Sequence, residues 1–146
     1  MNELKDPELR REIILDNYQN PMNRGLVSDS SYIKENTNNE SCIDNIDMQM
    51  KVVDGVICDI RFDGEACAIS TSATSIIIGM LMGKSVADAR RILRNYQNMI
   101  EEKEYDSDLL GELIVYDNIY RQPNRKKCAL LPHDAVVKML NRLDEV

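Results

Sequence analysis

No apolar segment of this sequence is long enough to span a membrane. The longest stretch, from Ile76 to Met82, is interrupted by Gly79 and falls well short of the roughly 18 residues that a transmembrane helix needs. The first residues also lack the basic start and apolar middle of a secretory signal. We therefore expect a soluble, cytoplasmic protein without a membrane partner.

Positive charge is scarce as well. Eighteen Lys and Arg stand against 25 Asp and Glu, which gives a net charge of -7. A protein that binds a nucleic-acid backbone needs a concentrated basic face, so we expect no nucleic-acid partner. The length of 146 residues fits one domain over 1–146, and we take a monomer as the default state.

Histidine occurs once, at position 133. It follows Pro132, which is predicted to open the last helix, so we expect His133 to be an exposed residue of a first helical turn. Ser and Thr cluster over 70–75, but no second imidazole is available to activate a nucleophile. The cluster is therefore predicted to cap and pack a helix rather than to catalyse.

Hydrophobic periodicity predicts an α+β fold. In the first half of the chain we expect a helix over 7–19 capped by Asp6, a strand around 32–34 and a hairpin of 45–53 and 56–63 that turns at Asp54-Gly55. In the second half we expect helices over 70–82 and 86–100, an acidic loop over 101–108, a short helix over 109–116 and a helix over 132–143. Ile46, Met48 and Met50 alternate with polar residues, which is typical of a sheet with one buried face. We expect a small antiparallel sheet with helices packed on one face.

Four cysteines remain, too few and too widely spaced for a disulfide scaffold. Cys58 is in phase with the apolar residues of its strand, so it is predicted to lie in the core. Cys42 precedes the first hairpin strand and Cys67 follows the second, so the antiparallel topology brings them to one end of the sheet. Asp44 lies two residues after Cys42, and two thiols with a carboxylate predict a metal site.

Cys128 is the remaining candidate thiol. It follows the basic residues 125–127, and basic neighbours favour the thiolate that binds metals and acts as a nucleophile. From spacing alone, a metal ligand, a transfer thiol and a core residue all stay open for this position.

Several short motifs carry a resemblance to a known family. They are Asn-Pro-Met-Asn-Arg-Gly at 20–25, Cys-Ile-Asp at 42–44, Gly-Glu-Ala-Cys-Ala-Ile-Ser at 64–70 and Arg-Lys-Lys-Cys-Ala-Leu-Leu at 125–131. In this order they resemble the SufU/IscU family of iron–sulfur cluster assembly proteins, and the implied fold is the α+β one. Lys127 stands where IscU proteins carry a histidine, and the long segment between Cys67 and Cys128 is similar to the SufU insertion.

The resemblance to SufU implies a zinc site formed by Cys42, Asp44, Cys67 and Cys128. It also implies a sulfur relay, in which Cys42 leaves the zinc and takes sulfur from the persulfide of a cysteine desulfurase, a pyridoxal-phosphate enzyme. A histidine of the desulfurase would take the vacated position, and Arg125 would steer the sulfur donor.

Two other functions stay open. One is an IscU-type scaffold on which an iron–sulfur cluster is assembled on the same cysteines. The other is a structural zinc or interaction module without transfer activity, which is kept open by Ile43 at a position where the family has glycine. Ala66 likewise replaces a family glycine, before the second cysteine.

Overall fold

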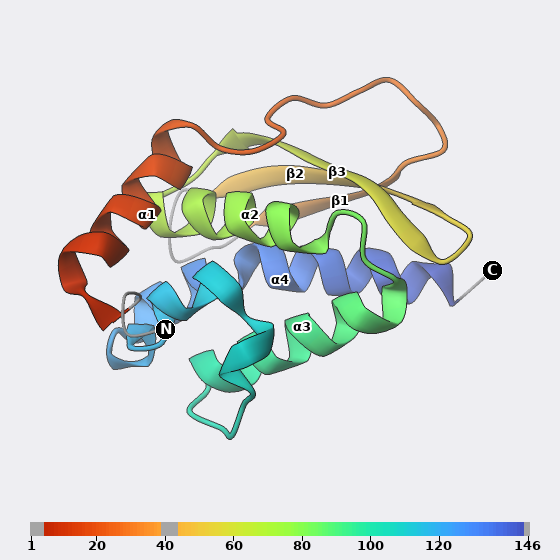
Figure 1. The fold of residues 1–146 in the computed structure, drawn as a ribbon. Coiled ribbons are helices and arrows are strands. Elements are labelled where there is room, and N and C mark those ends of the chain that lie inside the picture. The colour runs from red at the N-terminus through yellow and green to blue at the C-terminus, as the bar shows by residue number, and fades with distance from the viewer. Residues whose placement is uncertain (1–4, 39–43, 145–146) are drawn as a thin grey trace.

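A computed structural model describes residues 5–38 and 44–144 of the protein. Within these residues, three strands form an antiparallel sheet in the order β1-β2-β3 (Figure 1). The strands are β1 (Ile33–Asn38), β2 (Asn45–Val53) and β3 (Val56–Glu65). Asp54 and Gly55 join β2 to β3 with φ angles of 53° and 75°, the double positive φ of a tight hairpin turn. The predicted hairpin is therefore confirmed, and β1 extends the strand predicted around 32–34.

The alternation of β3 changes phase at Cys58, and the prediction that this cysteine lies in the core is wrong. The register passes from Lys51 opposite Asp59 to Val52 opposite Ile57, so Cys58 is an extra residue in a β-bulge. The alternation of side chains reverses across a bulge, so the residues of β3 before it lie on the opposite face from the one that strict alternation predicts. Ile57 is consequently buried and Cys58 is exposed, although Ile46, Met48 and Met50 are buried as expected.

Helices cover one face of the sheet, as predicted (Figure 1). They are α1 (Pro7–Gln19), α2 (Ala68–Leu81), α3 (Val86–Ile100) and α4 (Pro123–Leu143). Both α2 and α4 contact the sheet, whereas α3 packs against α4 and α1 packs against α2. The side chains of Asp6 and Ser85 accept hydrogen bonds from the backbone N–H groups of Glu8 and Asp88, which confirms both predicted N-caps.

The last helix begins nine residues earlier than predicted, at Pro123 instead of Pro132. Pro123 occupies the first turn, where a missing N–H has no cost, but Pro132 lies inside the helix. His133 is therefore a buried residue of mid-helix, with 4% of its surface exposed, and not an exposed first-turn residue. Its Nδ1 lies 2.8 Å from a carboxylate oxygen of Asp134.

Short 3₁₀ turns connect α3 to α4, in place of the short helix predicted over 109–116. They span Ser107–Leu109, Gly111–Tyr116 and Ile119–Arg121. Tyr116 lies 2.5 Å, oxygen to oxygen, from the hydroxyl of Ser72, and burial raises its pKa well above the ordinary value. None of the helices in the described part of the chain is long and apolar enough to cross a membrane.

Candidate metal centre

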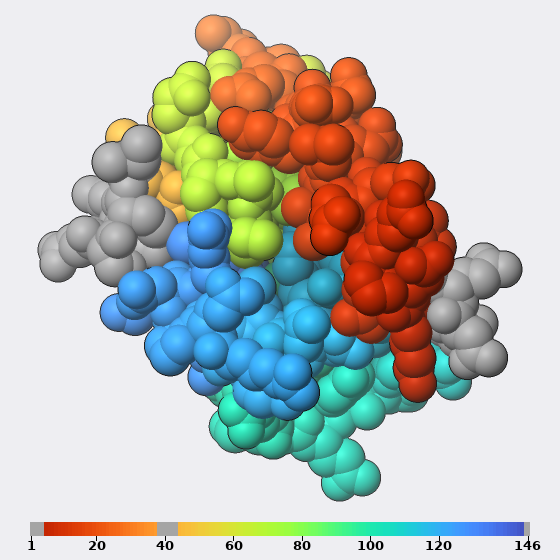
Figure 2. Space-filling model, turned by 90° about the vertical axis from the view of Figure 1, so that its left-hand side faces the viewer, coloured from red at the N-terminus to blue at the C-terminus, as the bar shows by residue number. Residues whose placement is uncertain are grey.

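Three side chains that could bind a metal meet at one end of the sheet. One ligand atom of each of Asp44, Cys67 and Cys128 lies within 4.8 Å of the others. Asp44 directly precedes β2, and the pairing of Asn45 with Glu65 brings it beside the end of β3, where Cys67 follows. Figure 2 shows this end of the molecule, with the yellow-green β3–α2 junction against the blue start of α4.

Cys67 is the N-cap of α2. Its sulfur accepts a hydrogen bond of 3.4 Å from the backbone N–H of Ser70, a role more often filled by a side-chain oxygen. This hydrogen bond fixes the position of the sulfur at the start of α2, just after the end of β3.

Asp44 is 1% exposed, and both of its carboxylate oxygens accept hydrogen bonds. The backbone N–H of Cys67 donates to Oδ1 at 2.6 Å, and the hydroxyl of Ser70 donates to Oδ2 at 2.7 Å. A buried carboxylate is costly unless it is hydrogen-bonded or paired with positive charge. These two donors fix the orientation of the carboxylate within the site.

Cys128 is contributed by the second turn of α4 and is 4% exposed. Its thiol lies 3.5 Å from the backbone carbonyl oxygen of Asn124, one turn earlier. Its own backbone carbonyl lies 3.0 Å from the hydroxyl of Ser70. The packing of α4 against α2 therefore sets the position of this third ligand.

The donor set fits a zinc ion. Zinc in proteins binds cysteine sulfur and carboxylate oxygen in a tetrahedral array. With bonds of roughly 2.3 Å to sulfur and 2.0 Å to oxygen, a tetrahedron places these two atoms about 3.5 Å apart. The sulfur of Cys67 lies 3.6 Å from Oδ2 of Asp44, which agrees with that spacing.

The other predicted site residues are placed as follows. Cys42 and Ile43 lie outside the described residues. Arg125 is exposed in the first turn of α4, three residues before Cys128. Cys58 lies near the hairpin turn, at the opposite end of the sheet from Asp44.

Ser70 was not predicted as a site residue. Its capping role was expected, and its position three residues after Cys67 is the N-capping spacing. The structure adds that its side chain contacts all three candidate ligands.

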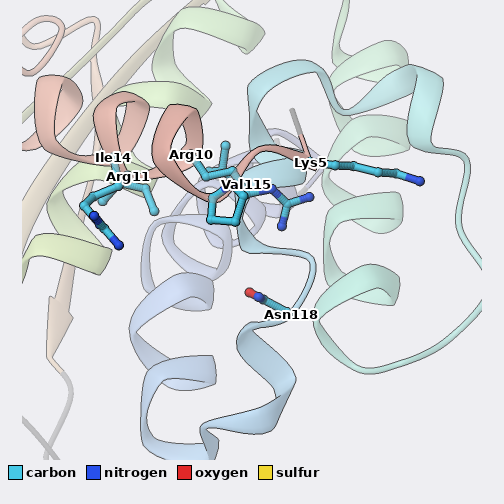
Figure 3. Close-up of a pocket in the computed structure, with 7 residues that line it drawn as sticks. Lys5, Arg10, Arg11, Ile14, Val115 and Asn118 are labelled. Atoms are coloured by element: carbon cyan, nitrogen blue, oxygen red, sulfur yellow. The ribbon is translucent and has the colours of Figure 1, made fainter. Parts of the chain in front are cut away.

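A cavity of about 350 Å³ between α1 and the 3₁₀ turns is lined by Lys5, Arg10 and Arg11. Figure 3 shows Lys5 and Arg11 extending in opposite directions. Arg10 forms a bidentate ion pair with Asp117, in which its two terminal nitrogens lie 2.5 and 3.1 Å from the two carboxylate oxygens. The three cations therefore do not converge on one anion, and the cluster at Asp44 remains the better candidate site.

The fold and the site define a class of protein: a small α+β domain with an Asp/Cys/Cys cluster where β2 begins and β3 ends. Residues 9–129 match the family described as the NifU-like N terminal domain. The chain accordingly belongs to the SufU/IscU family of iron–sulfur cluster assembly proteins, and the resemblance noted from the motifs is confirmed.

Individual relatives agree over most of the chain. The zinc-dependent sulfurtransferase SufU of Bacillus subtilis is 34% identical, over 89% of this chain and 88% of its own length. The iron–sulfur cluster assembly scaffold protein IscU of Thermotoga maritima is 29% identical, over 90% of this chain and 92% of its own length. The crystal structure of a putative iron–sulfur cluster assembly scaffold protein for the SUF system from Fervidobacterium islandicum superposes with a TM-score of 0.81 at 29% identity, over 88% of this chain and 94% of that one.

Proposed function

We propose that the protein is a zinc-dependent sulfur acceptor that takes persulfide sulfur from a cysteine desulfurase for iron–sulfur cluster assembly. The observation that carries the proposal is the convergence of Asp44, Cys67 and Cys128 within 4.8 Å. The 34% identity to a zinc-dependent sulfurtransferase over 89% of the chain supports zinc and sulfur transfer in particular.

Asp44, Cys67 and Cys128 would hold the zinc ion, and Cys42 is proposed as the fourth ligand. Zinc keeps its thiol ligands deprotonated without redox chemistry of its own, which suits a site that handles thiolates and persulfides. Cys42 precedes Asp44 by two residues in the sequence. Its place in the site is a prediction that rests on the motif at 42–44.

Cys42 is also the proposed acceptor of sulfur. Its thiolate attacks the outer sulfur of the desulfurase persulfide, so a new S–S bond forms to Cys42 while the S–S bond within the desulfurase breaks. The desulfurase cysteine leaves as a thiolate, and the proton of the persulfide stays on the transferred sulfur. Arg125 is exposed three residues before Cys128, and we propose that its guanidinium steers the sulfur donor by pairing with an acidic group of the desulfurase.

The test compares a Cys42→Ala variant with the parent protein in a desulfurase assay that measures alanine release under reducing conditions. We expect the parent to stimulate the desulfurase and Cys42→Ala to lose stimulation while keeping its circular dichroism spectrum. Cys58→Ser is the matched control, because Cys58 is exposed at the opposite end of the sheet. Equal stimulation by Cys42→Ala and the parent would contradict the relay.

The second candidate is an iron–sulfur scaffold, which is favoured by the 29% identity to an IscU protein over 92% of that protein. Lys127 counts against it, because the family's scaffolds carry a histidine there and lysine is a poor metal ligand at neutral pH. Anaerobic reconstitution followed by absorption and Mössbauer spectra decides between the two. A stable cluster that can be transferred to an acceptor protein favours the scaffold, and tightly bound zinc with no stable cluster favours sulfur transfer.

A further inference from the structure

Ser70 contacts all three described ligands of the proposed metal centre. Its side chain is fully buried, and its hydroxyl oxygen lies 2.7 Å from Oδ2 of Asp44. The same oxygen lies 3.0 Å from the backbone carbonyl oxygen of Cys128 and 3.5 Å from the sulfur of Cys67. One hydroxyl therefore links the segment before β2, the start of α2 and the second turn of α4.

Pro132 explains why the carbonyl of Cys128 is available to this hydroxyl. In an α-helix, the carbonyl of residue 128 accepts its hydrogen bond from the N–H of residue 132. Pro132 lies inside α4 and has no N–H, so the regular hydrogen bond from residue 132 to this carbonyl is absent. The hydroxyl of Ser70 supplies the donor that the proline removes.

The two acceptors share one proton. A serine hydroxyl has a single O–H, and a carboxylate oxygen and a carbonyl oxygen both lie within 3.0 Å of it. The arrangement is therefore a three-centre hydrogen bond, in which Asp44 and the backbone of Cys128 are tied to the same atom. A shift of either segment therefore changes a hydrogen bond of the hydroxyl that both segments share.

We propose that Ser70 is the positioning residue of the metal centre: its hydroxyl, which lies within hydrogen-bond distance of Oδ2 of Asp44 and of the carbonyl oxygen of Cys128, fixes these two residues relative to one another before the ion binds. The proposal rests on the proposed metal-binding function. Hydrogen bonds of this kind orient the ligands of metal sites, and their loss typically lowers metal affinity by about 10- to 100-fold.

The experiment uses four variants of the full chain: Ser70→Ala, Pro132→Ala, the double variant, and Ser72→Ala as the matched control. Ser72 is an equally buried serine of α2 whose hydroxyl contacts Tyr116 and the carbonyl of Ile69, not the ligands. Zinc affinity is measured by competition with a chromophoric chelator, and cobalt substitution reports the thiolate-to-metal absorption. Urea unfolding in the presence of a chelator reports the metal-free protein.

We expect Ser70→Ala to bind zinc about 10- to 100-fold more weakly than the parent, and Ser72→Ala to stay within about threefold. Pro132→Ala restores an N–H at position 132. Its gain in the urea midpoint should therefore be larger in the Ser70→Ala background, where the hydrogen bond from Ser70 to the carbonyl of Cys128 is absent, than in the parent. The double variant should still bind zinc weakly, because Asp44 has not regained the hydroxyl. If Ser70→Ala does not fold, zinc affinity is measured on the double variant instead.

Two results would overturn the proposal: Ser70→Ala binding zinc as tightly as Ser72→Ala, or Pro132→Ala shifting the urea midpoint equally with and without Ser70. Failure of the proposed function looks different. A parent protein that binds no zinc would refute the metal site, while the unfolding comparison in chelator would still decide whether Ser70 ties Asp44 to Cys128.

Discussion

Replacing Asp44 with alanine is the most direct test of the site before any metal is bound. In the folded protein, Oδ1 of Asp44 accepts from the N–H of Cys67 and Oδ2 accepts from the hydroxyl of Ser70. Alanine removes both acceptors. Ser70 can still donate to the carbonyl of Cys128, but the N–H of Cys67 loses this partner.

The expected cost follows from these contacts. Hydrogen bonds to charged groups contribute about 1.5 to 3 kcal/mol each, and relief from burying the carboxylate offsets part of the sum. We therefore expect Asp44→Ala to lower the free energy of unfolding by about 2 to 3 kcal/mol. At roughly 3 °C per kcal/mol for a chain of this length, Tm falls by roughly 6 to 9 °C.

Asp44→Asn should lower the free energy of unfolding much less than Asp44→Ala. Its amide oxygen can accept from the N–H of Cys67, and its amide nitrogen can donate to the hydroxyl oxygen of Ser70. The hydroxyl proton then goes to the carbonyl of Cys128. We expect a loss of about 1 kcal/mol, because the hydrogen bonds persist without the charge.

Thermal melting followed by circular dichroism at neutral pH, with a chelator present, measures these differences in metal-free protein. Asp47→Ala is the control, since Asp47 is an exposed carboxylate of β2 that accepts a hydrogen bond from Asn36. We expect it to change stability by about 0.5 kcal/mol or less. An Asp44→Ala protein that melts within about 2 °C of the parent would refute the reasoning.

Two further predictions concern the sheet. Gly64→Ala should lower the free energy of unfolding by on the order of 3 kcal/mol and weaken zinc binding, because Gly64 has a φ of 130° and a Cβ there would lie 2.2 Å from the carbonyl oxygen of Asn45. Gly55→Ala is the control: a Cβ there meets nothing within 4 Å, so the loss should be only about 1 kcal/mol. Urea unfolding measures both losses, and equal losses would contradict this contrast. The hydrogen bond to Asp59 raises the pKa of Tyr32 to about 12, so the stabilisation it gives is complete below about pH 10 and is lost as the pH rises toward 12. Asp59→Asn should lower this pKa in a titration of phenolate absorbance, and an unchanged titration would contradict the assignment.

Cys58 shows where the sequence pattern reached its limit in the sheet. Strict alternation through β3 predicts a buried thiol, and the bulge opposite Lys51 and Val52 reverses the prediction. A bulge adds one residue without changing the local composition. Its position depends on how two strands pair, so alternation along one strand cannot reveal it.

Pro132 shows the same limit in the helices. Proline usually begins or interrupts a helix, and this rule placed the start of the last helix nine residues too late. In this structure the helix continues through Pro132, and the hydroxyl of Ser70 from α2 donates to the carbonyl that would otherwise pair with the N–H of residue 132. His133 was misplaced for the same reason, since it was assigned to a first turn that does not exist.

The sequence by itself determined the hairpin with its Asp-Gly turn, the capped starts of α1 and α3, and the nearness of Asp44 and Cys67, because these depend on residues close in the chain or on two paired strands. The family resemblance of the motif at 125–131 implied that Cys128 belongs to the site, but only the tertiary structure brought its ligand atom within 4.8 Å of those of Asp44 and Cys67 and joined it to Asp44 through Ser70. Those contacts arise where α4 packs against α2, and packing between segments 58 residues apart leaves no local signature in the sequence.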